Sequence, residues 1–105
     1  AKAPRKQLLV MALILSLEAE QDLLDIWTHI AADSSVNADA FLNKLAETMQ
    51  ALADFTNIGV DRPELGRELK SFPSYRYVLY YRVSTSNDVE LVRIMHGSRD
   101  VQSVL

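Results

Sequence analysis

Residues 16–52, SLEAEQDLLDIWTHIAADSSVNADAFLNKLAETMQAL, decide the fold because two apolar stripes at helical spacing run through them. In the first half, apolar residues recur three and four positions apart, which predicts one buried face of an amphipathic helix. Its stripe is Ala19, Leu23, Ile26, Trp27 and Ile30. The Ser16 hydroxyl can accept a backbone N–H and so cap the first turn. We expect this helix to end near Ala32.

The second half predicts another amphipathic helix. Polar residues 33–35 interrupt the pattern, and either Ser35 or Asn37 can cap the next helix. The second stripe is Phe41, Leu42, Leu45, Met49 and Leu52. Two helices joined by a few polar residues are typical of an antiparallel helical hairpin.

The flanking segments predict strands. Residues 10–15 form a short apolar run, which is typical of a strand buried on both faces. Residues 55–68 contain two glycines and a proline and lack periodicity, so a loop is expected. Three strands should follow, at 69–72 (ended by Pro73), at 75–83 and at 89–95. In the last strand, Val89, Leu91 and Arg93 are expected to share a face.

The predicted fold class is therefore α+β, in the order β-α-α-β-β-β. The helical hairpin should pack on one face of a mostly antiparallel sheet. The chain has 105 residues, which suits one compact domain, and we assign that domain to residues 11–105. Residues 1–10 precede a natural start at Met11 and lack periodicity, so we interpret them as an added extension or a poorly ordered leader.

Composition excludes several classes of protein. The chain has no cysteine, which excludes disulfide scaffolds and cysteine-rich zinc sites. No apolar run approaches the roughly 20 residues that span a bilayer, so no membrane partner is expected.

Charge is unevenly distributed along the chain. The net charge is −3, but residues 1–15 carry +3, residues 16–65 carry −8 and residues 66–105 carry +2. The acidic middle segment should repel phosphate backbones, and the last third is too weakly basic for general nucleic-acid binding.

No enzyme motif is evident. The sequence lacks a phosphate-binding loop, a dinucleotide fingerprint and a nucleophile elbow, and its two histidines, His29 and His96, are 67 positions apart. We therefore predict no cofactor, no metal and no catalytic residues. One alternative stays open: Arg76, Arg93 and His96 could grip RNA phosphates and move a proton. The simpler interpretation is that the arginines balance the acidic helices or pair with a partner's carboxylates.

Four segments in register resemble the ParE branch of the ParE/RelE toxin superfamily. They are LSLEAEQDLLDIW at 15–27, RPELG at 62–66 with LKSFP at 69–73, RYVLYYR at 76–82, and VRIMHGSRD at 92–100. The resemblance runs from about Ala12 to the C-terminus. It implies a helical hairpin against an antiparallel sheet, which agrees with the periodicity.

The resemblance also implies a function. Such toxins are cytoplasmic bacterial proteins of plasmid-stabilising toxin–antitoxin systems. They inhibit growth by poisoning DNA gyrase, and a ParD-like antitoxin neutralises them. The antitoxin binds operator DNA, so the toxin meets that DNA only indirectly. RelE-like relatives instead cut messenger RNA on the ribosome. This chain departs from them, because it has few basic residues and its tail, 102–105, has no tyrosine. A non-toxic regulatory role is a further alternative.

Two sets of binding residues are expected. A free sheet edge and the tail should meet the target, through Arg93, His96, Arg99 and Asp100. An uncovered apolar stripe marks an interface, and a free strand edge accepts an added strand. The expected antitoxin contacts are Leu23, Trp27, Ile30, Leu45 and Met49, with Arg76 and Arg82 on the sheet pairing with carboxylates.

Overall fold

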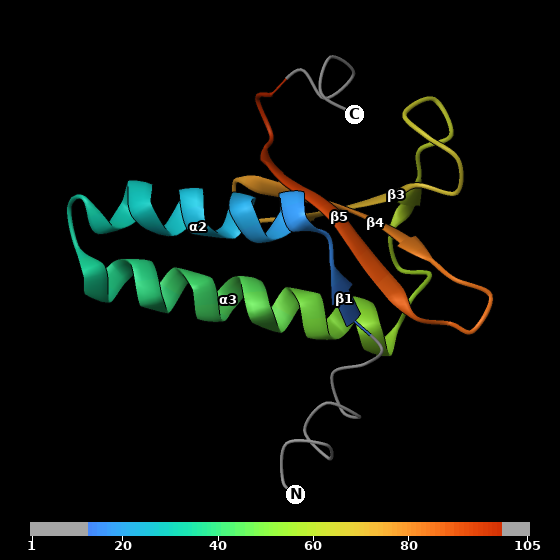
Figure 1. The fold of residues 1–105 in the computed structure, drawn as a ribbon, viewed down its shortest axis with the longest axis horizontal. Helices are drawn as coiled ribbons and strands as arrows, with labels where there is room; N and C mark the ends of the chain where they lie inside the picture. Colours follow the sequence, from blue (N-terminus) through green and yellow to red (C-terminus); the bar gives the residue numbers. More distant parts are fainter. Residues whose placement is uncertain (1–12, 100–105) are drawn as a thin grey trace, which may run out of the picture.

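The computed structural model describes residues 13–99 and confirms the predicted α+β fold. Two antiparallel helices pack against a five-stranded sheet (Figure 1). The elements are β1 (Leu13–Leu15), α2 (Leu17–Ala31), α3 (Ser35–Asp54), β2 (Val60–Asp61), β3 (Lys70–Ser74), β4 (Tyr77–Val83) and β5 (Val89–His96).

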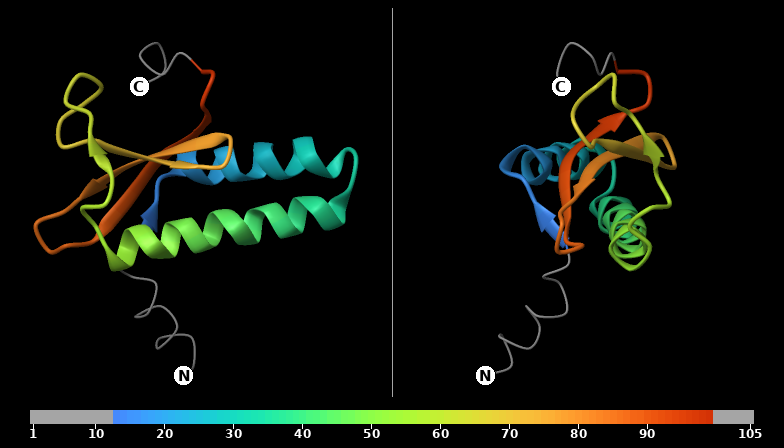
Figure 2. Two further views of the ribbon diagram at one scale, coloured as in Figure 1. Left: turned by 180° about the vertical axis from the view of Figure 1, so that it is seen from behind. Right: turned by 90° about the vertical axis from the view of Figure 1, so that its right-hand side faces the viewer.

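The sheet has the strand order β1-β5-β4-β3-β2. β1 pairs with β5 in parallel, and every other pair is antiparallel. The helical hairpin extends well beyond the strands, so its turn and the sheet lie at opposite ends of the molecule (Figures 1 and 2). Among residues 13–99, no helix combines the length and the hydropathy needed to cross a membrane.

Apolar side chains pack on both faces of the sheet. On the helix side, Leu45 and Leu52 of α3 and Ala19 and Ile26 of α2 meet strand residues in one buried cluster; the strand residues are Leu79, Tyr81, Val89, Leu91 and Ile94. On the opposite face, a smaller cluster joins Tyr80 and Met95 to Leu69 of the preceding loop. The sheet is thus covered by the hairpin on one side and by loop residues on the other.

The helix boundaries follow from capping. Ser16 caps α2 as predicted, because its Oγ accepts a hydrogen bond from the Ala19 N–H at 3.0 Å. The cap of α3 is Ser34, whose Oγ accepts from the Asn37 N–H at 3.1 Å, so the prediction of Ser35 or Asn37 was wrong by one or more positions. Several serines in sequence offer the same chemistry, and only the backbone path selects one.

Three strand predictions need correction. The segment predicted as a loop contains β2, a fourth strand after the helices. β3 continues through Pro73 to Ser74, which is possible because β2 pairs only with Lys70 and Ser71 and leaves β3 as an edge at the proline. β1 is not buried on both faces, since Ile14 is 51% exposed.

A β-bulge changes the faces of β5. Tyr81 pairs with Leu91 while Tyr80 pairs with Arg93, so Val92 is an extra residue on β5. The predicted alternation of Val89, Leu91 and Arg93 was therefore wrong beyond Leu91: Ile94, not Arg93, joins Leu91 in the core.

The fully buried Tyr81 fastens the loop after α3 to the sheet. Its hydroxyl donates to the Thr56 carbonyl at 3.0 Å and accepts from the Gly59 N–H at 2.9 Å. Burial raises the pKa of this phenol. Gly59 is needed here because a Cβ would collide with the Tyr81 hydroxyl and would lie 2.9 Å from the Ser71 carbonyl oxygen.

Gly59→Ala is therefore expected to lower the free energy of unfolding by about 1–3 kcal/mol, the usual cost of overpacking. Urea denaturation measures this. Gly66→Ala is the matched control, because a Cβ there meets nothing closer than 3.6 Å. Equal stability of the two variants would show that the Tyr81 anchor does not need a glycine.

Candidate functional site

The first half of α2 and its cap lie along one edge of β5 and hydrogen-bond to its backbone. Within the described residues 13–99, β1 pairs only with residues 89–91, and no strand lies beside the second half of β5 on that side. The Ser16 hydroxyl donates to the Val92 carbonyl at 2.8 Å. Six residues further along the chain, in α2, the Asp22 carboxylate accepts the Ile94 backbone N–H at 2.8 Å. The helix thus replaces a missing strand at an edge that would otherwise accept one.

Asp22 also holds Arg93. The guanidinium donates to both carboxylate oxygens, through Nε at 2.8 Å and through a terminal nitrogen at 3.0 Å. The Asp22 side chain is 11% exposed and the Arg93 side chain is 19% exposed. The hydrogen bond to Asp22 raises the pKa of Arg93 above its usual value, against the opposing effect of burial. Arg93 is thus a charged, largely covered part of the fold.

Beyond this pair lies a small cleft of about 180 Å³ between α2 and the end of β5. It brings together His29 and His96, which sequence analysis treated as unrelated. Asp25, Tyr77 and Arg99 also line it. The His96 Nδ1 is within 2.8 Å of the Ser98 Oγ, which fixes the ring at the rim. Within residues 13–99, no cluster of three metal-ligating side chains is found.

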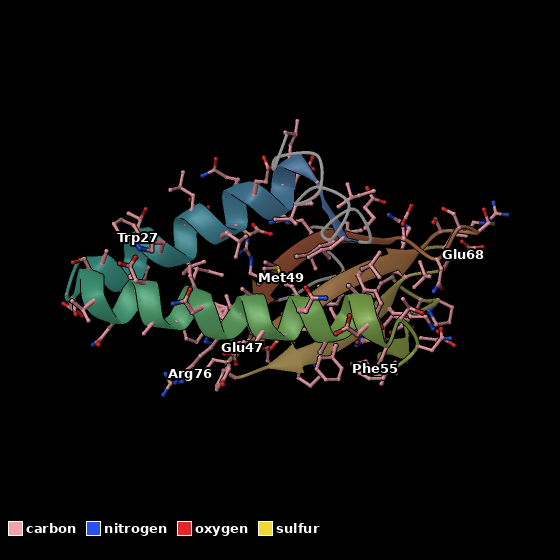
Figure 3. All side chains as sticks on the ribbon, turned by 90° about the horizontal axis from the view of Figure 1, so that it is seen from below. Trp27, Glu47, Met49, Phe55, Glu68 and Arg76 are labelled. Carbon is pink, nitrogen blue, oxygen red and sulfur yellow. The ribbon has the colours of Figure 1, made fainter. Side chains whose placement is uncertain are left out.

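Arg76 comes close to the same end of the sheet. It lies in the turn between β3 and β4, and its carbonyl accepts the Gly97 N–H at 2.8 Å. Its exposed side chain points away from the ribbon (Figure 3). Arg82 is at the far end of β4, with its Nε donating to the Arg67 carbonyl at 3.1 Å. Arg76 therefore lies just outside β4, which begins at Tyr77, whereas Arg82 lies within it.

The four predicted target contacts therefore differ in their surroundings. His96 and Arg99 are exposed at the cleft, whereas Arg93 is committed to Asp22. Asp100 lies outside the described residues. For the alternative nuclease set, the consequence is that His96 and Arg76 are accessible but the guanidinium of Arg93 is occupied.

The predicted antitoxin contacts divide in the same way. Leu23, Trp27 and Ile30 are partly exposed. Trp27 lies near the hairpin turn, where its Nε1 donates to Asp39 at 2.8 Å (Figure 3). Leu45 and Met49 are core residues, 0% and 9% exposed, so we no longer count them among the candidate antitoxin contacts.

Sequence analysis missed other exposed apolar residues on the hairpin. Leu17 and Leu24 of α2 are 79% and 56% exposed, and Val36 at the start of α3 is 74% exposed. Leu17 and Leu24 are seven positions apart and so share one side of α2. That spacing was the available signal, but it lies off the stripe that packs on the sheet. We call Leu17, Leu24, Trp27 and Val36 the hairpin surface.

Comparison with known proteins identifies the family of this chain and a solved structure with a similar fold. Residues 13–101 match the family model for the ParE toxin of the type II toxin–antitoxin system parDE. The fold is similar to a solved structure described as the chromosomal ParDE TA system from P. aeruginosa, with a TM-score of 0.70 and 20% sequence identity over 84% of this chain and 97% of that one. No curated protein is detectably similar in sequence. On the match over residues 13–101, the chain belongs to the ParE family of type II toxins.

Proposed function

We propose that this toxin inhibits DNA gyrase by protein–protein binding and that a ParD-like antitoxin neutralises it. Membership of the ParE family is the observation that carries the proposal. A gyrase inhibitor needs no active site, because it has only to bind one state of the enzyme's cycle more tightly than the others. Both steps would take place in the bacterial cytoplasm. Operator DNA would be reached only through the antitoxin.

The chemistry of the candidate site supports binding over catalysis. A nuclease would need Arg93 free to hold a phosphate, yet both oxygens of Asp22 already pair with it. The accessible residues His96, Arg99 and Arg76 still form a set of one acid–base group and two cations. That set favours ribosome-dependent RNA cleavage as the second candidate function.

Pulse labelling in growing cells separates the two candidates. After induction of the toxin, a gyrase inhibitor should stop thymidine incorporation while methionine incorporation continues for some minutes. An RNA nuclease should stop methionine incorporation first. Co-expression of the cognate antitoxin should restore both signals. Undiminished growth with folded toxin would instead favour a non-toxic regulatory member.

The hairpin surface is our candidate for the antitoxin interface. Its four residues are apolar or aromatic; Leu17, Leu24 and Val36 are exposed, and Trp27 is partly exposed. Exposed apolar patches on small proteins commonly mark interaction sites. Leu23 and Ile30 extend this surface, and the exposed Arg76 and the partly exposed Arg82 remain candidates for pairing with antitoxin carboxylates.

Leu24→Ala is expected to weaken antitoxin binding about tenfold, which corresponds to about 1.4 kcal/mol. The lost contact is apolar, so the change should appear mainly in the dissociation rate. Surface plasmon resonance with immobilised antitoxin measures it. Val60→Ala is the control, because Val60 is 62% exposed on β2 at the other end of the molecule. If Val60→Ala weakens binding more than Leu24→Ala, the interface lies on the sheet edge.

A further inference from the structure

The turn between β3 and β4 holds a tyrosine in a conformation that suits glycine. Tyr75 has φ 59°, in the left-handed region. For a residue with a bulky side chain this is an outlier that costs roughly 1–2 kcal/mol. Two-residue hairpin turns with a positive φ at the first position favour glycine there. Backbone strain of this kind persists where the surroundings enforce it, and it is concentrated at functional sites.

The strain brings no burial in return, since Tyr75 is 64% exposed. Its ring is nonetheless held in place from α3. The Phe41 and Tyr75 rings pack edge-to-face, with a centroid distance of 5.8 Å and an interplanar angle of 63°. The Lys44 ammonium lies 5.5 Å from the ring centroid, within range for a cation–π contact. Tyr75 is therefore an exposed aromatic side chain in a fixed orientation.

Tyr75 begins a continuous row of rings. Phe41 also packs on Tyr77 at 5.7 Å, and Tyr77 meets the ring of His96 at 5.4 Å. We call Tyr75, Phe41, Tyr77 and His96 the aromatic row. It crosses α3, the β3–β4 turn, β4 and β5, and it ends at the cleft that contains His29 and Arg99.

Cations accompany the row in a protein whose net charge is −3. Lys44 lies over its first ring, Arg76 follows Tyr75 in the turn, and Arg99 lines the cleft at its far end. None of the three forms an ion pair with any residue in the 13–99 range. Asp25 lines the cleft and Glu47 lies on α3, and within residues 13–99 neither carboxylate forms an ion pair with these cations.

We propose that the aromatic row and its three cations form a docking surface for an acidic segment of a protein partner, with Tyr75 as the principal contact. Tyrosine and arginine are the residues enriched at the energetic centres of protein interfaces. Unpaired lysine and arginine side chains bind carboxylates through charge-assisted hydrogen bonds. A nucleic-acid partner would require a wider positive field, whereas residues 16–65 carry −8.

The surface differs in chemistry from the apolar hairpin surface, so we assign it to the toxin's target. Of its residues, only Arg76 is also a candidate for pairing with the antitoxin. In this assignment alone the inference rests on the proposed function. The partner is defined here by its acidic, peptide-like character, and the surface can serve another protein target if gyrase is not bound.

The test uses Tyr75→Gly, because glycine removes the side chain and the backbone strain together. Tyr75→Phe, which keeps the ring, is the matched control. The full-length variants are induced in cells and the toxin dose for half-maximal growth arrest is measured. Purified variants are compared by melting temperature, antitoxin affinity and binding to labelled single-stranded RNA. We expect Tyr75→Gly to need about a 30-fold higher dose, with a melting temperature equal to or above wild type and unchanged antitoxin affinity. Tyr75→Phe should arrest growth like wild type.

Several results would overturn the inference. Two concern growth: arrest by Tyr75→Gly at the wild-type dose, or no arrest by the wild-type toxin. Two concern binding: a loss of antitoxin affinity in Tyr75→Gly that matches its loss of toxicity, or tight RNA binding by the wild-type toxin that Tyr75→Gly abolishes. A further result separates the inference from the proposed function. If the wild-type toxin arrests cells whose gyrase does not bind it, and Tyr75→Gly does not, the docking surface is supported and gyrase inhibition is contradicted. Lys44→Glu adds an independent check, because charge reversal should also raise the toxic dose.

Discussion

Asp22→Ala is expected to lower the free energy of unfolding by about 3–5 kcal/mol, because it leaves a largely covered guanidinium without its partner. The Asp22 carboxylate serves Arg93 twice and the Ile94 N–H once. Removing it therefore exposes the edge of β5 as well as an unpaired charge. Since domains of this size are stable by only about 5–15 kcal/mol, the variant should be partly unfolded at 37 °C.

Urea denaturation of the variant beside Asp25→Ala measures this effect. Asp25 is exposed on the same helix, and its side chain accepts a hydrogen bond from Gln21, so its loss should cost no more than about 0.5 kcal/mol. The double variant Asp22→Leu with Arg93→Met should recover much of the lost stability, because no buried charge remains unpaired. A loss below about 1 kcal/mol for Asp22→Ala would mean that α2 does not close the sheet edge.

Leu45→Ala is expected to cost about 2–5 kcal/mol of stability, the range for emptying a buried leucine site. Leu45 of α3 is fully buried in the core cluster, where the helices pack against the sheet. Leu24→Ala on the hairpin surface should change stability by no more than about 0.5 kcal/mol. Urea denaturation of the free toxin measures both. A loss of stability below about 1 kcal/mol for Leu45→Ala would contradict its place in the core and favour the predicted contact with the antitoxin.

Leu45 also illustrates what periodicity can predict. The stripes at helical spacing correctly indicated two antiparallel helices, because helix formation and burial depend on the same local pattern. Periodicity cannot tell whether a stripe is covered by the sheet or left for a partner. Leu45 and Met49 were therefore expected at an interface and lie in the core, while the exposed Leu24 was not selected.

The candidate site depended on contacts that local patterns do not encode. Asp22 and Arg93 are 71 positions apart, and either could have paired with solvent or with a partner. The bulge at Val92 moves Ile94 into the core and turns Arg93 toward α2, and no residue type signals a bulge reliably. His29 and His96 line the same cleft because α2 lies along the edge of β5. The turn at Tyr75 was hidden because tyrosine is a residue favoured in strands.

The measurement that tests the central claim most directly is a supercoiling assay with purified gyrase, relaxed plasmid, ATP and this toxin free of antitoxin. Gyrase inhibition by protein binding predicts a dose-dependent loss of supercoiling, with linear DNA accumulating once the proteins are denatured. Full supercoiling in the presence of a several-fold excess of demonstrably folded toxin would contradict it.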